Sequence, residues 1–159
     1  MRMGNRRPGR SLLALAGLMA VATACAACGG GPAKVSLKDA SANPCLLVSQ
    51  AEARAILGPG ISKPKLAPEL GSGCDYASGT RLVNLGIDLG TASLGYFSIL
   101  MTGPHPVPSV GHRARCGPVR SNPAESDLFA AISHDHKFVI VGPSCAIDAA
   151  FARQAYSHL

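Results

Sequence analysis

Residues 128–145 read LFAAISHDHKFVIVGPSC, and this stretch decides the predicted fold class. Two apolar runs at 128–133 and 137–141 flank the polar tripeptide 134–136, which is the pattern of an antiparallel hairpin with a polar tip. Ser144 stands at an N-cap position after the second run and predicts a C-terminal helix. Locally paired strands that are followed by a helix indicate an α+β fold, in which helices pack on an antiparallel sheet.

The residues before the hairpin predict two further strands. Residues 81–89 alternate between apolar and polar side chains, as in a half-buried strand, and residues 96–102 form a second apolar run after a turn. Glycine and proline punctuate residues 58–73, which we expect to be a long loop. The prolines of residues 103–108 restrict this segment to a loop or to a sheet edge.

A short helix is predicted over residues 49–57. Ser49 and Glu52 have the spacing of a capping box, and Gly58-Pro59 supplies a strong stop signal. Together, these patterns predict an α+β domain with an antiparallel sheet of about four to five strands, a short N-terminal helix and a C-terminal helix.

Residues 1–27 have the three parts of a secretory signal peptide. Four arginines lie within the first ten residues, an apolar run follows at 12–21, and small residues then lead to cysteine. The apolar run is too short to span a bilayer comfortably. Small residues that end in cysteine and precede a glycine run resemble a bacterial lipobox, in which the cysteine thiol is acylated and becomes the mature N-terminus.

Two cysteines, Cys25 and Cys28, compete for acylation. Acylation of Cys28 leaves an even set of four cysteines, whereas acylation of Cys25 leaves Cys28 as an odd thiol in an oxidising compartment. We therefore predict lipidation at Cys28, with Cys25 as the alternative. The predicted organisation is a signal peptide at 1–27, a lipidated flexible tether at 28–43 and a single domain at 44–159.

The net charge of +6 comes mainly from the leader. Without the four leader arginines, 11 basic residues face 9 acidic residues, which leaves a net charge of +2. The remaining basic residues are scattered along the chain, whereas nucleic-acid-binding proteins cluster theirs. We expect no nucleic-acid partner, and we expect a location on the extracytoplasmic face of the cell membrane through the lipid anchor.

The four cysteines of the predicted domain are expected to form two disulfides. Their successive separations of 29, 42 and 29 residues lack the close cysteine pairs of a structural zinc site. Cys45 precedes the first predicted helix and Cys74 the first predicted strand, while Cys116 closes the proline-rich loop and Cys145 opens the last helix. Four cysteines allow three connectivities, of which we predict Cys45–Cys74 with Cys116–Cys145.

Three segments of the chain carry recognisable sequence motifs. Residues 45–58 contain a cysteine, two leucines, a serine cap and a helix that ends in Leu-Gly, and residues 71–76 have the pattern Gly-x-x-Cys-x-aromatic. Residues 107–114 are similar to a Gly-x-Gly-Asp-x-Ala loop, with Ser109 in place of the first glycine and His112 in place of the aspartate. These segments resemble a family of small actinobacterial surface lipoproteins, domain of unknown function number 3558. The resemblance covers about residues 45–159 and implies a lipid-anchored surface protein without an established activity.

Histidines supply the candidate reactive groups, and each has a plainer explanation. His134 and His136 suit the start of a metal site, but a polar hairpin tip explains them without a third ligand. His112 and Cys116 suggest a Cys–His nucleophile, whereas a cysteine in an oxidising compartment is more often disulfide-bonded. The sequence has no phosphate-binding loop, dinucleotide fingerprint or serine-hydrolase motif. We therefore predict no catalytic residues, no metal site and no cofactor.

The leading hypothesis is a non-catalytic binding or accessory module of the cell envelope. Its partner would be an envelope protein or a small or lipidic ligand, bound close to the membrane that holds the anchor. The alternative hypothesis is a cell-wall-directed hydrolase with a cryptic site around His112, His134 and His136.

Overall fold

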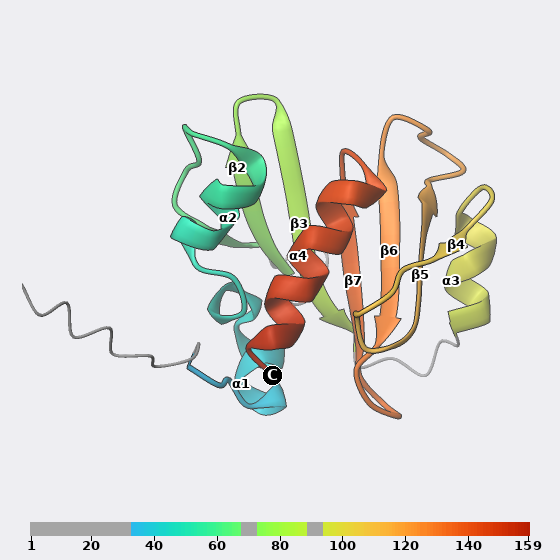
Figure 1. The fold of residues 1–159 in the computed structure, drawn as a ribbon, viewed down its shortest axis with the longest axis horizontal. Coiled ribbons are helices and arrows are strands. Elements are labelled where there is room, and N and C mark those ends of the chain that lie inside the picture. The colour runs from blue at the N-terminus through green and yellow to red at the C-terminus, as the bar shows by residue number, and fades with distance from the viewer. Residues whose placement is uncertain (1–32, 68–72, 89–93) are drawn as a thin grey trace, which may run out of the picture.

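The predicted hairpin is part of a larger antiparallel sheet (Figure 1). The computed structural model describes residues 33–67, 73–88 and 94–159. Within these residues, seven strands pair in the order β1-β2-β3-β7-β6-β5-β4. The strands are β1 (Lys65–Ala67), β2 (Gly73–Ser78), β3 (Arg81–Asp88), β4 (His105–Pro106), β5 (His112–Pro118), β6 (Ser126–Ala131) and β7 (Lys137–Gly142). The helices are α1 (Leu37–Ala42), the 3-10 helix η1 (Pro44–Leu46), α2 (Gln50–Leu57), α3 (Leu94–Leu100) and α4 (Cys145–Ser157).

Strand β7 lies between β6, its hairpin partner, and β3, which is distant in sequence. Leu128 of β6 lies opposite Ile140 of β7, and this antiparallel register confirms the predicted hairpin. Leu85 of β3 lies opposite the same Ile140 on its other side. All three side chains are fully buried, so this row of cross-strand neighbours forms the centre of the hydrophobic core.

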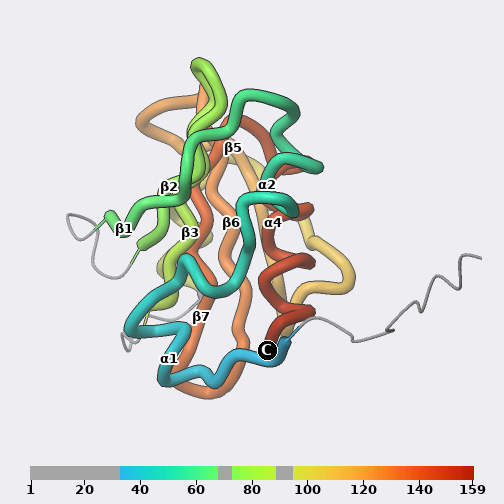
Figure 2. The backbone as a smooth tube through the Cα atoms, turned by 90° about the vertical axis from the view of Figure 1, so that its left-hand side faces the viewer, coloured from blue at the N-terminus to red at the C-terminus, as the bar shows by residue number. Residues whose placement is uncertain are grey.

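Helices α2 and α4 cover one face of the sheet, as Figures 1 and 2 show. Phe151 of α4 meets Tyr76 of β2 with the ring centroids 5.0 Å apart, and both rings are fully buried. The Tyr76 hydroxyl donates a hydrogen bond to the carbonyl of Val48 at 2.9 Å, so the polar end of this ring is satisfied. Helix α3 packs against β6 through Phe97, which stacks on Phe129 with the centroids 4.1 Å apart.

The local signals of both predicted helices are confirmed. Ser49 accepts a hydrogen bond from the N–H of Glu52, and the Glu52 carboxylate accepts one from the N–H of Ser49, which completes the capping box of α2. Gly58 follows α2 with a φ of 93°, a left-handed conformation that favours glycine. Ser144 caps α4 by accepting a hydrogen bond from the N–H of Ile147.

The sheet is larger than the predicted sheet of about four to five strands. Strand β1 lies inside the stretch 58–73 that we expect to be a loop, and β4 lies at the sheet edge, where its proline is tolerated. The sequence does not reveal β2 and β5 because few aliphatic side chains mark their inward positions. Cys74 and Tyr76 point inward from β2, and Ala114 and Cys116 are buried in β5.

The prediction of a strand at 96–102 is wrong, because most of this segment lies in helix α3. Phe97 of this helix stacks on Phe129 of β6, and Met101, the first residue after the helix, is 1% exposed and forms an isolated antiparallel bridge with Val119. Tyr96 and Ile99 are more than half exposed. The aromatic and β-branched composition favours a strand, but packing on one side of β6 decides the conformation.

The described part of the expected tether is folded onto the domain. Residues 37–42 form α1, which Ser36 caps by accepting a hydrogen bond from the N–H of Asp39. Ala40 is fully buried, and the N–H of Val35 donates to the carbonyl of His158 at 2.7 Å. The expectation of a flexible tether is therefore wrong for residues 33–43, because this stretch packs against the C-terminal helix and the sheet.

Both predicted disulfides are present. Cys45 pairs with Cys74 across a Cα–Cα distance of 5.1 Å, and Cys116 pairs with Cys145 across 5.7 Å. The first bridge joins η1 to β2, and the second joins β5 to the first residue of α4. Each bridge closes a separation of 29 residues, so each constrains only its own half of the domain.

Peptide mapping without reduction should recover one peptide pair that joins Cys45 to Cys74 and another that joins Cys116 to Cys145. Removing one bridge by a paired substitution to alanine should lower the free energy of unfolding by about 3–4 kcal/mol, because a loop of this size gains that much chain entropy when it is opened. A peptide that joins Cys45 to Cys116 or to Cys145 would contradict the pairing.

Candidate functional site

A groove of about 470 Å³ lies on the sheet near the turns that lead into β3, β6 and α4. It is lined by exposed loop residues and by strand residues of β2, β3 and β7. This volume is in the range of small-molecule binding sites. Its lining includes Asp75, Leu82, Asn84, Asn122, Glu125 and Val141.

The strand register builds the polar floor of this groove. Asp75 of β2, Asn84 of β3, Val141 of β7 and Asp127 of β6 are successive cross-strand partners, so their side chains share one face of the sheet. The Asn84 amide donates to Asp75 Oδ1 at 2.8 Å, and Asn84 is 8% exposed. These contacts hold a carboxylate and an amide in fixed positions beside the apolar surface of Val141.

Gly73 makes room for the Asn84 side chain. A Cβ atom on Gly73 would lie 2.9 Å from Asn84 Nδ2, which is closer than side-chain atoms tolerate. Gly73, which directly precedes Cys74, therefore helps to form the groove, because only a residue without a side chain lets the Asn84 amide lie flat on β2.

Asp127 places a second acid beneath the same face. It is 8% exposed, and burial together with the nearby carboxylate of Glu125 raises its pKa to about 6. Glu125 itself is exposed and lines the groove. The groove itself is lined by two carboxyl groups, those of Asp75 and Glu125, together with the amides of Asn84 and Asn122, and the described residues that line it include no lysine, arginine or histidine.

A second buried acid, Asp148, lies in the first turn of α4. Ser126 donates a hydrogen bond to its Oδ2 at 2.5 Å, while Oδ1 is buried without a hydrogen-bond partner in the described structure. Burial raises the pKa of Asp148 to about 7 against the opposing effect of the Ser126 hydrogen bond, and the charge of Asp127 adds to the rise. Gly142 accommodates the carboxyl group, since a Cβ at this position would collide with Oδ1.

The histidines of the hairpin tip are held by their own neighbours. The side chains of His134 and Asp135 are 98% and 78% exposed, and His134 Nδ1 lies 2.6 Å from Asp135 Oδ1. His136 Nδ1 lies 2.9 Å from the Ser133 hydroxyl. His112 begins β5 at the same end of the sheet. The part of the chain that the structure describes contains no group of three or more histidine, cysteine or acidic residues arranged to hold a metal ion.

The Cys–His pair considered in the sequence cannot supply a thiolate, because Cys116 is bonded to Cys145. The predicted lipidation residues Cys25 and Cys28 lie outside the described residues. The sequence analysis did not predict the groove. Asn84, on the polar face of the alternating strand, was the one residue whose position could have indicated it. Its partners Asp75 and Asp127 come from strands that pair with β3 directly or through β7.

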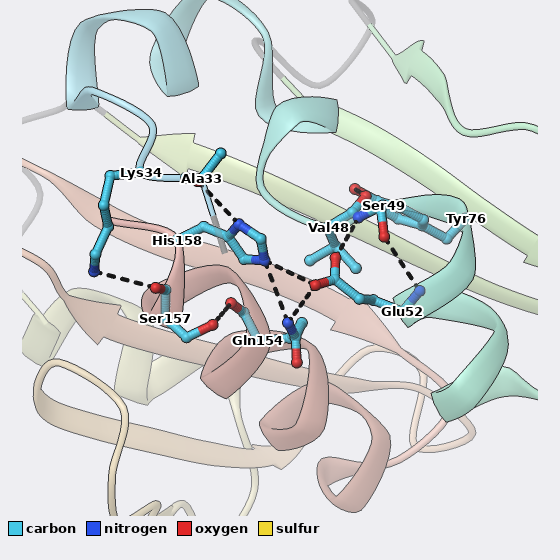
Figure 3. Close-up of polar contacts among 9 residues, drawn as sticks. All are labelled: Ala33, Lys34, Val48, Ser49, Glu52, Tyr76, Gln154, Ser157 and His158. Atoms are coloured by element: carbon cyan, nitrogen blue, oxygen red, sulfur yellow. Dashed lines mark hydrogen bonds and ion pairs between the residues drawn. The ribbon is translucent and has the colours of Figure 1, made fainter. Parts of the chain in front are cut away.

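A cluster of polar contacts fixes the chain where it enters the domain, and we call it the clasp (Figure 3). Glu52 Oε1 accepts hydrogen bonds from Gln154 at 2.6 Å and from His158 Nε2 at 2.9 Å. His158 Nδ1 lies 3.3 Å from the carbonyl of Ala33, and Lys34 donates to the carbonyl of Ser157 at 3.1 Å. Each ring nitrogen of His158 therefore lies beside an oxygen atom that can accept a hydrogen bond.

The clasp and the α2 cap share one carboxylate. Burial opposes the charge of Glu52, but hydrogen bonds from the N–H and hydroxyl of Ser49 and from His158 outweigh it, so the pKa of Glu52 lies below its usual value. The ionised carboxylate therefore joins three segments: the entry to α2, the end of α4 and, through His158, the chain at Ala33.

Comparisons with protein-family models, characterised proteins and solved structures give no match for this chain. Among the described residues, no helix is long and apolar enough to cross a membrane. The assignment of the groove therefore rests on its own geometry, and the resemblance to the lipoprotein family stays a prediction.

The variant Asp148→Asn should remove part of the pH dependence of stability. The folded protein raises the pKa of Asp148 above its unfolded value of 3.8, so folding binds a proton and the wild type loses stability as the pH rises from about 4 to about 7. Between pH 5 and pH 8 this loss amounts to about 2–3 kcal/mol, and Asp127 adds a smaller loss of the same sign. Thermal unfolding at several pH values measures the difference.

The matched control is Asp135→Asn, which neutralises an exposed acid at the hairpin tip and should leave the pH profile of the wild type unchanged. Equal pH profiles for Asp148→Asn and the wild type would show that Asp148 is ionised in the folded protein without a stability cost.

Proposed function

We propose that this protein is an extracytoplasmic lipoprotein that is anchored at Cys28 and acts as a non-catalytic binding module, with the groove as its ligand site. One observation carries the proposal: the groove and the entry of the chain lie at opposite ends of the sheet. The groove is lined at the β2–β3 turn and the β5–β6 connection, whereas the clasp holds Ala33 beside the C-terminal end of α4. In Figure 1 these turns lie at the top and the C-terminus at the bottom.

The anchoring part rests on the leader, on the two disulfides and on the family resemblance. Two disulfides are typical of exported domains. The loop at 107–114 supports the resemblance, because Ser109 and Gly111 have φ values of 64° and 46°. These are the two positions at which the family has glycine, and left-handed backbone is the conformation that favours glycine.

The ligand class follows from the groove. Carboxyl groups and side-chain amides surround the apolar side chains of Leu82 and Val141, so the groove favours a small molecule that carries an amine and a short apolar body. Leu82 is 52% exposed, which leaves apolar surface available for that body. The cell-wall hydrolase is the alternative function, and an envelope-substrate screen with His112, His134 and His136 all changed to alanine tests it.

The variant Cys28→Ala should release the protein from the membrane fraction or stall its processing, because it removes the thiol that would be acylated. Cys25→Ala is the matched control and should leave both membrane retention and processing unchanged. Retention of Cys28→Ala together with release of Cys25→Ala would assign the anchor to Cys25.

Short alkyl amines should bind the groove, whereas alkyl carboxylates of the same length should not. Amide NMR of the folded domain should show shifts of the Asn84 and Asn122 side-chain signals with hexylamine and none with hexanoate. The double variant Asp75→Asn with Glu125→Gln should abolish the shifts, because it removes two carboxylates of the groove. Asp135→Asn is the control at the far end, and equal responses to both probes would contradict the ligand class.

A further inference from the structure

A second cavity, of about 570 Å³, lies between α3 and β5, next to the edge strand β4. Figure 1 shows α3 beside β4 and β5, at the edge of the sheet that lies opposite β1 and β2. We call this cavity the arginine cleft, and its lining residues are Gly95, Ser98, Pro106, Arg113, Ala114 and Arg115. Two of these described residues are cations and none is an acid, so the cleft has the opposite charge to the groove.

The charge of the two arginines is not compensated within the cleft. Among the described residues, no carboxylate forms an ion pair with either guanidinium. Arg115 Nη1 donates to the carbonyl of Pro104 at 3.5 Å, which occupies one of the five N–H groups of this guanidinium. Arg113 is exposed and lines the same cavity. Both side chains therefore have N–H donors that an anionic ligand can use.

The acidic residues of the neighbouring strands and of the nearby turn do not line the cleft. Strands β4 and β6 pair with β5, and the one acid that they carry is Asp127, which lies opposite Gly117 and is 8% exposed. Residues 101–104 cover Gly117, because a Cβ atom there would lie 3.0 Å from a carbonyl oxygen of this segment. At the β6–β7 turn, Asp135 lies 2.6 Å from Nδ1 of its neighbour His134.

The backbone conformation of Arg113 is unusual for an arginine. Its φ is 56°, in the left-handed region that favours glycine. The register of β5 with β6 shifts between His112 and Arg115, so Arg113 lies in a β-bulge. Bulges redirect side chains and are frequent beside functional sites, and strained residues persist where they serve a function. An arginine at a position that suits glycine indicates that the side chain is what this position requires.

We propose that the arginine cleft binds a phosphate group. Each guanidinium is a planar fork of N–H donors that matches two oxygen atoms of an anion. One carboxylate has only two oxygens and fills a single fork, whereas a phosphate group has three strong acceptor oxygens and can engage two arginines. The volume of the cleft suits a small molecule that carries this group. The site depends neither on the lipidation of Cys28 nor on the ligand of the groove.

A titration with inorganic phosphate tests the site in the full-length protein, held in a neutral detergent at constant ionic strength. The backbone amide NMR signals of Gly95 and Ala114 report on the cleft, and phosphate should shift them to saturation. Acetate should bind about tenfold more weakly, because it can engage one guanidinium fork instead of two. Equal affinities for phosphate and acetate would overturn the phosphate assignment.

Two arginine variants and a matched control locate the binding. Arg113→Gly and Arg115→Gln should each weaken phosphate binding about tenfold or more, because each removes one fork of charged donors. Arg153→Gln removes the same charge from an exposed position on α4 and should leave the affinity unchanged. Cleft signals that respond equally in all three variants would overturn the site.

The melting temperature of Arg113→Gly separates a binding role from a structural role. Glycine adopts a φ of 56° without strain, so this variant should melt at the same temperature as the wild type or higher while it loses phosphate affinity. A lower melting temperature would show that the arginine supports the fold, and would overturn the argument from its backbone conformation.

A soluble phosphate ester and a lipid headgroup both carry the group that the cleft would bind. Glycerol phosphate and the water-soluble lipid dibutanoyl phosphatidylglycerol present the two sources separately in the same titration. Tighter binding of glycerol phosphate that is lost in Arg115→Gln supports a soluble ester, and tighter binding of the lipid that is lost in the same variant supports a headgroup. Saturation with neither compound overturns the proposal.

Discussion

The pairing of β3 with β7 is the interaction on which the rest of this structure depends. It joins β1, β2 and β3 to the four later strands, across about fifty residues of chain. The disulfides do not make this connection, because Cys45–Cys74 lies within the first half and Cys116–Cys145 within the second. Without the β3–β7 ladder, the bridges would hold two separate pieces whose apolar faces are exposed.

The C-terminal helix reinforces that junction from above the sheet. The helix contacts β5, β6 and β7, while its Phe151 packs on Tyr76 of β2 in the other half. Its last turn reaches Glu52 of α2 through Gln154 and His158. Burial at the middle of the helix and charged hydrogen bonds at its end therefore hold the same two halves together, and the clasp also fixes where the chain enters.

The same ladder creates the groove and concentrates its acids. Asp75 and Asp127 lie in one cross-strand row only because β7 separates β3 from β6. Asp127 lies in β6, and Asp148 lies in the first turn of α4. Burial raises the pKa of both carboxyl groups, so their ionisation at neutral and higher pH lowers the stability of the folded protein.

The sequence by itself determined the local features of this protein. The capping box at Ser49, the polar tip between two apolar runs and the disulfide connectivity each depend on residues that are neighbours along the chain or at the ends of short segments. Side-chain periodicity cannot show which distant strands pair, so the position of β7 beside β3 and the row from Asp75 to Asp127 were decided by the tertiary structure. Packing on β6 likewise made residues 94–100 helical against their strand-like composition, and contact with His158 ordered a stretch that has no pattern of its own.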